Sequence, residues 1–202
     1  MMRIGIDIDG VLTNVEQFSI DYFSKYCFEN NIEYNIGESH YNISKTFGVS
    51  SKQEDDFWDK YLEFYAVNEK ARPFASEVIK KLKKDGHEIY IVTARWLTNR
   101  DDSIGQNMRK IVKKWLLENE IVYDKLIFSK GLKEKKRQEV IENKIDLMIE
   151  DNPSNINELS RIVPVICYDT TYNKNCSNNK IFRCYSWYDI YRKLKEISNN
   201  DI

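Results

Sequence analysis

The stretch that decides the fold is "RIGIDIDGVLTN", residues 3–14. Its isoleucines alternate with small or acidic residues, which is typical of a strand, and the apolar run is followed by a glycine. Asp7 and Asp9 interrupt this pattern, although a buried strand has no structural use for two carboxylates. Because residues i and i+2 of an extended chain project to the same side, we expect both carboxylates to emerge together at the end of the strand.

Strand-like and helix-like segments alternate through the middle and C-terminal parts of the chain. The expected strands are 3–8, 87–94, 125–129, 145–149 and 162–167, and the expected helices are 71–86, 106–119, 134–144, 153–159 and a last helix after Ser186. Pro73 suits the first turn of the 71–86 helix, and Gly86 suits its C-terminal cap. This alternation predicts an α/β fold, with a Rossmann-like parallel sheet and helices on both faces.

Residues 14–70 do not follow this alternation. They contain an aromatic helical pattern over 15–29 and a second one over 50–65, where Ser51 and Glu54 are spaced as a capping box. We therefore expect a core domain formed by 1–13 and 71–202, with a small helical cap inserted after the first strand.

Composition excludes several classes of function. The 202 residues include 31 basic and 32 acidic ones, so the chain lacks the charge of a protein that binds long nucleic acid. No segment approaches the roughly 18 apolar residues of a membrane span, and the short first apolar run is not a signal peptide. No cysteine pair is spaced C-x-x-C, which favours reduced thiols and a cytoplasmic location. A homodimer is compatible with these numbers.

Polar side chains follow three of the expected strands. Asp7 and Asp9 follow the first, Thr93 ends the second, and the 145–149 strand leads into Glu150 and Asp151. Each feature alone has an ordinary explanation as a turn or a helix cap. Together they meet at one edge of a parallel sheet, where clustered carboxylates favour a hard cation such as Mg²⁺. The sequence therefore predicts a site that binds Mg²⁺ and phosphate.

Three motifs, "IDIDGVLTN", "IVTAR" and "LMIEDNPSN", resemble those of the haloacid dehalogenase (HAD) superfamily of aspartate-nucleophile phosphatases. The helical insertion after the first motif is similar to that of the 5'(3')-deoxyribonucleotidase group, which includes bacterial nucleotidases. The resemblance implies that Asp7 is the nucleophile and forms an aspartyl-phosphate. It implies that Asp9 protonates the leaving oxygen and then acts as base on the hydrolytic water.

The same resemblance implies a set of metal and phosphate ligands. Mg²⁺ would be held by Asp7, the backbone carbonyl of Asp9, and Asp151. Glu150 would act through a metal-bound water, and Asn155 would assist there. The phosphoryl group would contact the remaining residues of the set, which are Thr93, the backbone N–H of Ala94, and a lysine.

The position of that lysine stays open between four residues, Lys130, Lys133, Lys135 and Lys136. We favour Lys136, about ten residues before the strand near Asp146, with Lys133 second. Aromatic cap residues would contact the leaving group, with Trp58 favoured among Phe18, Tyr22, Phe57, Trp58 and Tyr61.

The resulting expectation is a Mg²⁺-dependent phosphomonoesterase that hydrolyses nucleoside monophosphates. Arg95 departs from the small residue expected in the animal deoxyribonucleotidases, which weakens the transfer of their substrate preference. The alternatives are a phosphatase acting on another small ester, such as a sugar phosphate, and a non-catalytic binding protein on the same fold.

Overall fold

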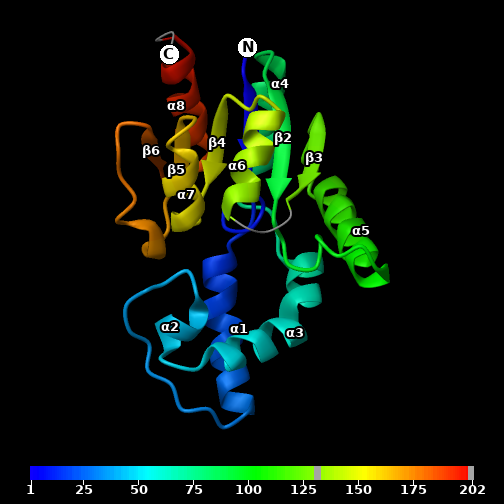
Figure 1. Ribbon diagram of the computed structural model, residues 1–202, viewed down its shortest axis with the longest axis vertical. Helices are drawn as coiled ribbons and strands as arrows, with labels where there is room; N and C mark the ends of the chain where they lie inside the picture. Colours follow the sequence, from blue (N-terminus) through cyan, green and yellow to red (C-terminus); the bar gives the residue numbers. More distant parts are fainter. Residues whose placement is uncertain (130–132, 200–202) are drawn as a thin grey trace.

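A computed structural model describes residues 1–129 and 133–199 of the chain, and its centre is a parallel sheet of six strands in the order β3-β2-β1-β4-β5-β6 (Figure 1). The strands are β1 Arg3–Ile6, β2 Glu88–Thr93, β3 Lys125–Phe128, β4 Leu147–Glu150, β5 Val165–Tyr168 and β6 Ile181–Cys184. The expected α/β fold with a parallel sheet is therefore confirmed. The sixth strand lies beyond the polar segment 169–180 and was not among the expected strands.

The central strand β1 contains the first four residues of the stretch "RIGIDIDGVLTN". Ile6 is level with Ile91 of β2 and with Ile149 of β4. The expected strand 3–8 is too long, because the chain leaves the sheet after Ile6 and turns at Gly10, whose φ is +86°. Asp7 stays attached to the sheet edge through its N–H, which donates to the carbonyl of Ile149 at 3.1 Å.

Helices cover both faces of the sheet, as expected (Figure 1). The apolar residues of α4 Ala75–Lys84, α5 Ser103–Glu118 and α8 Trp187–Asn199 pack together with β1 in one cluster. Those of α6 Lys133–Glu142 and α7 Pro153–Leu159 pack in another cluster with Met148 and Val165. Because these helices cover the two faces of the sheet, the carboxyl ends of the strands remain available to form a site.

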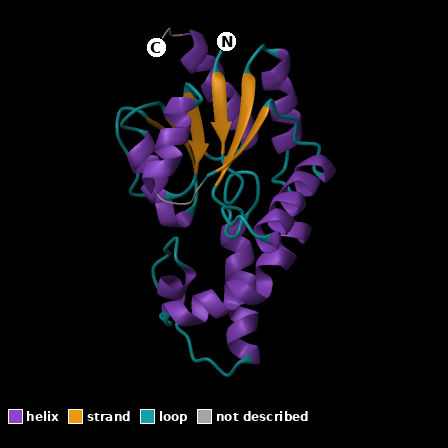
Figure 2. Ribbon diagram, turned by 45° about the vertical axis from the view of Figure 1, so that its right-hand side comes forward, coloured by secondary structure: helices purple, strands orange, loops and turns teal. Residues whose placement is uncertain are grey.

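Residues 14–70 form three helices and no strand. They are α1 Val15–Glu29, α2 Ile43–Phe47 and α3 Ser51–Asn68. These helices share an aromatic cluster of their own, in which Phe23, Phe47 and Phe57 are fully buried. Figure 2 shows this helical group beyond the carboxyl ends of the strands, with the strand arrows pointing toward it.

Arg72 joins the two connections between the helical group and the sheet. Its N–H donates to the carbonyl of Leu12 at 2.7 Å, and its guanidinium donates to the carbonyls of Thr13 and Gly10 and to the side chain of Asn14. These four donor contacts hold the outgoing and returning segments against each other. These contacts fix the point at which the chain crosses between the sheet and the helical group.

Two local predictions were wrong in their capping residues. Pro73 does not begin a helix, because α4 starts at Ala75 after Phe74, which adopts a left-handed φ of +65°. The capping box of α3 is formed by Ser50 and Gln53, one residue earlier than expected. In both cases the residue that precedes the helix is the immediate neighbour of the residue that was expected to cap or start it.

Two further segments differ from the expected elements. The expected strand 162–167 is replaced by β5 Val165–Tyr168, because the N–H groups of Ile162 and Val163 donate to the carbonyl of Leu159 and continue the turn after α7. The polar segment after β5 contains the short 3₁₀ helix η1 Thr171–Asn173. In the described part of the chain, every helix is too short or too polar to cross a bilayer.

Candidate active site

Three carboxylates meet at the carboxyl edge of the sheet, between the ends of β1 and β4. One oxygen from each of Asp7, Glu150 and Asp151 lies within 4.8 Å of the others, and all three residues are buried. The parallel pairing of β1 with β4 causes this convergence, because it places Ile6 level with Ile149, and Asp7 and Glu150 are the residues that follow. An unneutralised group of this kind is costly, so the arrangement requires positive charge nearby.

Lys136 supplies part of that charge from α6. Its Nζ lies 3.2 Å from Asp7 Oδ2 and also contacts Glu150 Oε1, while its side chain is only 3% exposed. Burial alone would lower the pKa of Lys136, but the charges of Asp7 and Glu150 outweigh it and raise the pKa. Lys136 is therefore a fixed cation beside Asp7. Lys130 and the side chains of Lys133 and Lys135 lie outside the described residues.

Glu150 is held entirely by donors of the protein. Oε1 accepts from Lys136 and from the amide of Asn155, and Oε2 accepts from the N–H groups of Asp151 and Asn152 at 2.9 and 3.0 Å. These four contacts use the acceptor capacity of a carboxylate. Glu150 therefore orients Lys136 and the turn after β4, and it has little capacity left for a metal.

Asp151, unlike Glu150, has an oxygen that accepts no hydrogen bond from the described part of the chain. Its Oδ2 accepts from the hydroxyl of Tyr172, but its buried Oδ1 has no hydrogen-bond partner among the described residues. A Cβ at Gly10 would come within 1.9 Å of Asp151 Oδ2, so the turn after β1 passes directly against this carboxylate. Asp151 thus presents an unsatisfied oxygen in a buried position, as a metal ligand would.

The titration behaviour of the buried carboxylates also fits a bound cation. Burial raises the pKa of Asp7, and the charges of Glu150 and Asp9 add to this effect, while Lys136 opposes it. Burial and the charge of Glu150 likewise raise the pKa of Asp151. A divalent cation at these oxygens would stabilise both ionised carboxylates. The residues present therefore fit Mg²⁺, for which carboxylate oxygens are suitable ligands.

Asp9 does not join this group, although the sequence pattern predicts that the two aspartates emerge together. It lies in the turn after β1, and its carboxylate is held by Arg95 and Tyr65. Arg95 follows β2, and Tyr65 comes from α3. Residues i and i+2 project to the same side only in an extended chain, and the chain is no longer extended after Ile6.

Thr93 and Ala94 occupy the end of β2, beside β1. Thr93 is fully buried, and its Oγ1 accepts from the N–H of Arg95 at 3.1 Å. The hydroxyl proton of Thr93 can still be donated to another group. The expected phosphate-binding residues therefore lie at the same sheet edge as Asp7.

A cavity lies between the sheet edge and the helical group. Asp9, Ala94 and Arg95 line it from the core, and Trp58 and Tyr65 line it from α3. Of the five aromatic residues considered from the sequence, Trp58 alone is among those lining this cavity. Phe57 and Tyr61 are instead buried in the aromatic cluster of the helical group.

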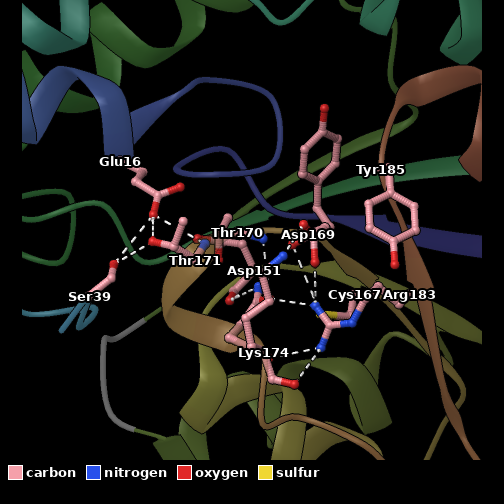
Figure 3. Close-up of polar contacts among 12 residues, drawn as sticks. Glu16, Ser39, Asp151, Cys167, Asp169, Thr170, Thr171, Lys174, Arg183 and Tyr185 are labelled. Carbon is pink, nitrogen blue, oxygen red and sulfur yellow. Dashed lines mark hydrogen bonds and ion pairs between the residues drawn. The ribbon is translucent and has the colours of Figure 1, made fainter.

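The loop after β5 connects the helical group to the carboxylates. Figure 3 shows Thr171 contacting both Glu16 of α1 and Ser39, and the N–H of Thr171 donates to Glu16 at 3.2 Å. Arg183 of β6 holds the same loop through an ion pair with Asp169 at 2.8 Å (Figure 3). This loop carries Tyr172, so the donor to Asp151 is attached to both parts of the molecule.

Several residues of the site were not predicted from the sequence. Tyr65 lies within an aromatic helix and Tyr172 within a polar loop, and no spacing rule connects either of them to the aspartates. Arg95 was noted only as a departure from related motifs. Its position two residues after Thr93 is the one signal that could have identified it, because a charged side chain there must meet the carboxylates at the sheet edge.

Comparison with known proteins agrees with this geometry. A family model described as "5' nucleotidase, deoxy (Pyrimidine), cytosolic type C protein" matches residues 1–197. The chain belongs to this nucleotidase family. A nucleotidase of Clostridium acetobutylicum is 34% identical over 191 residues, covering 94% of this chain and 92% of that protein.

Solved structures of HAD hydrolases share the fold of this nucleotidase-family chain. A HAD-like family hydrolase from Streptococcus pneumoniae has a TM-score of 0.62 at 14% identity, with 96% of this chain and 98% of that chain covered. CbbY from Rhodobacter sphaeroides, solved in complex with phosphate, has a TM-score of 0.60 at 11% identity, with 93% and 95% covered. These structures show the shared fold, the family model confirms the expected nucleotidase family, and the protein is a hydrolase of the phosphatase class.

Proposed function

We propose that the protein is a Mg²⁺-dependent phosphomonoesterase that forms an aspartyl-phosphate on Asp7 and hydrolyses nucleoside monophosphates. The observation that carries this proposal is the meeting of Asp7, Asp151 and Lys136 at one buried sheet edge. A carboxylate beside a fixed cation and an unsatisfied ligand oxygen suits attack on an anionic phosphate. Family membership supports the same class of reaction.

Mg²⁺ would be held by Asp7, by the backbone carbonyl of Asp9 and by Asp151. When bound, it would offset the negative charge of these carboxylates and of the phosphoryl oxygens. The unpartnered Oδ1 of Asp151 supports this assignment, whereas the four protein donors on Glu150 support a role for that residue in holding Lys136.

In the first half of the reaction, an oxygen of Asp7 forms a bond to phosphorus while the bond to the leaving oxygen breaks. Asp9 gives its proton to that oxygen. In the second half, Asp9 takes a proton from water as the water oxygen bonds to phosphorus, and the bond to Asp7 breaks. The hydroxyl of Thr93, the N–H of Ala94 and the ammonium of Lys136 hold the phosphoryl oxygens throughout.

The cavity supports a leaving group that carries an aromatic ring and little charge. Trp58 and Ile43 line it from the helical group. Among the described residues that line it, Arg95 and His40 are the basic ones, and Arg95 is already paired with Asp9. A second phosphate would find little positive charge there, which favours monophosphates over bisphosphates. A sugar phosphate is the alternative, since it would use the same phosphate site without the aromatic contact.

The proposal also includes a cytoplasmic location, since all four cysteines are free and buried and need no oxidising compartment.

The test of the function is a panel of nucleoside 5'- and 3'-monophosphates, sugar phosphates and p-nitrophenyl phosphate, assayed with Mg²⁺ and with EDTA. We expect nucleotides to be the best substrates and EDTA to remove activity. Trp58→Ala should raise KM for nucleotides but not for sugar phosphates, which lack an aromatic ring. A sugar phosphate preferred over every nucleotide would contradict the substrate assignment.

A further inference from the structure

Arg95 contacts Asp9 in a geometry that fixes the orientation of a carboxylate. Its Nε lies 3.1 Å from Oδ1 and 3.2 Å from Oδ2 of Asp9, and its Nη2 lies 2.5 Å from Oδ1. The side chain of Arg95 is only 1% exposed, so water does not compete for these contacts. A planar guanidinium that donates to both oxygens restricts rotation of the carboxylate, which a single ammonium cannot do.

Tyr65 completes the arrangement from the helical group. Its hydroxyl donates to Asp9 Oδ1 at 2.8 Å, and its ring centroid lies 5.2 Å from the guanidinium carbon of Arg95. Its oxygen also lies 2.6 Å from Thr13 Oγ1. Asp9 is therefore held by donors from two separate parts of the chain.

These donors are distributed unequally between the two oxygens of Asp9. Oδ1 accepts from Tyr65 and from two nitrogens of Arg95, whereas Oδ2 accepts only from Arg95 Nε among the described residues. Oδ2 thus keeps acceptor capacity for one more partner. In the proposed reaction, Oδ2 carries the proton that is donated to the leaving oxygen in the first half, and it accepts the proton of the hydrolytic water in the second.

We propose that Arg95 is a positioning residue that orients Asp9 for proton transfer through Oδ2. This inference rests on the proposed function of Asp9 and adds a residue to the site. The proton itself moves between Asp9 and the substrate or water, and Arg95 neither gains nor loses one. Arg95 acts by holding the carboxylate in one rotamer, so its removal should lower the rate of chemistry more than the affinity for substrate.

A direct contact between Arg95 and the phosphoryl group is the competing explanation. Arg95 Nη1 is buried and has no hydrogen-bond partner among the described residues, so both of its N–H donors are spare. The two explanations predict different effects of an Arg95 substitution in a protein whose Asp9 is already disabled. A residue that acts only through Asp9 has no further effect once Asp9 is disabled, whereas a direct phosphate contact has an independent effect.

The experiment is a double-mutant cycle of Arg95→Ala and Asp9→Asn, assayed with a nucleoside monophosphate and Mg²⁺. We expect Arg95→Ala alone to lower kcat about 100-fold, within the range for general acid–base catalysis, with KM changed less than about threefold. In the Asp9→Asn background, Arg95→Ala should change kcat by less than about threefold. Guanidinium chloride at millimolar concentration should partly restore kcat in Arg95→Ala but not in Asp9→Asn.

Arg109→Ala is the matched control, because Arg109 donates to the carbonyls of Thr98 and Arg100 and supports the loop after Arg95 without contacting Asp9. We expect it to lower stability and to keep kcat. If Arg95→Ala does not fold, the same cycle is run with Arg95→Lys, which keeps the charge and loses the planar fork.

The inference is overturned if the losses in kcat multiply across the cycle, or if the Arg95 variant raises KM at unchanged kcat. It is also overturned if the Arg95 variant keeps the wild-type kcat and KM. Failure of the proposed function would differ from these results, because the wild-type protein itself would then lack Mg²⁺-dependent phosphatase activity, or Asp7→Asn would keep it.

Discussion

Lys136 Nζ lies 3.2 Å from Asp7 Oδ2 and also contacts Glu150 Oε1, so one buried ammonium neutralises charge on two carboxylates. The three side chains come from α6, from the turn after β1 and from the end of β4. Lys136 therefore contributes both to the stability of the sheet edge and to the proposed reaction.

Replacing Lys136 by Met should destabilise the protein by about 3–5 kcal/mol, because it leaves buried carboxylates without their partner. Activity should fall as well, since the phosphoryl group would lose a cation. Urea unfolding measures the first effect. Lys80→Met is the control, because Lys80 pairs with Glu120 at the surface and its loss should cost less than about 1 kcal/mol. Equal losses in the two variants would contradict the assigned role of Lys136.

Gly10 is expected to be required for the metal site. Its φ of +86° disfavours a side chain, and a Cβ would come within 1.9 Å of Asp151 Oδ2. Gly10→Ala should therefore weaken Mg²⁺ binding at least tenfold, a loss of about 1.4 kcal/mol or more. The rise of Tm with Mg²⁺ concentration gives the affinity.

Gly86→Ala is the matched control for this substitution. Gly86 has nearly the same φ, +87°, but nothing within 4 Å of its Cβ position. The control should lose stability through backbone strain and bind Mg²⁺ like the wild type. An unchanged Mg²⁺ affinity in Gly10→Ala would show that the turn does not support the metal site.

Stability without metal should fall as pH rises between about 4 and 8. Burial raises the pKa of Asp7 to about 8 in the metal-free site, above the ordinary value of about 3.9 in the unfolded chain. In this window the folded state binds more protons than the unfolded state, so the free energy of unfolding decreases with pH by up to about 1.4 kcal/mol per unit. Mg²⁺ should remove much of this slope, because it stabilises the ionised form.

The measurement is the Tm between pH 4 and 8, recorded in EDTA and in Mg²⁺. Asp7→Asn is the control, and it should show a smaller slope in EDTA because it removes the titrating group. A metal-free protein whose stability rises steadily through this range would contradict the account of the buried carboxylates.

The four cysteines should react slowly with thiol reagents in the folded protein. All four are buried and free, and burial raises the pKa of Cys167 and Cys184 to about 12. Because the thiolate is the reactive form, the native protein at pH 8 should titrate slowly with Ellman's reagent, and all four thiols should react once it is unfolded. Rapid modification of a native thiol would show that its surroundings open readily.

The sheet edge could be predicted from the sequence because parallel strands bring their carboxyl ends together. Asp7, Thr93 and Asp151 each follow a recognisable apolar run, and strand pairing alone places them at one edge. Lys136 was harder to predict, since neighbouring lysines offered the same charge. Which of these lysines reaches the site depends on which turn of α6 faces β4, and this is decided by the packing of α6.

The environment of Asp9 could not be predicted in the same way. Local alternation holds only while the chain is extended, and β1 ends at Ile6, before Asp9 can share the direction of Asp7. The partners of Asp9 are Tyr65 and Arg95, which are 56 and 86 residues away in the chain. The pairing of β1 with β2 brings Arg95 close to Asp9, and the placement of α3 over the sheet edge adds Tyr65.

The most direct test of the account is to identify the phosphorylated residue during turnover. The protein is mixed with labelled p-nitrophenyl phosphate and Mg²⁺, quenched in acid, and the labelled peptide is sequenced. We expect the label on Asp7 and none in Asp7→Asn. Asp9→Asn should accumulate the labelled form, because nitrophenolate leaves without a proton while hydrolysis still needs a base. Phosphatase turnover with label on another residue, or continued turnover by Asp7→Asn, would contradict the central claim.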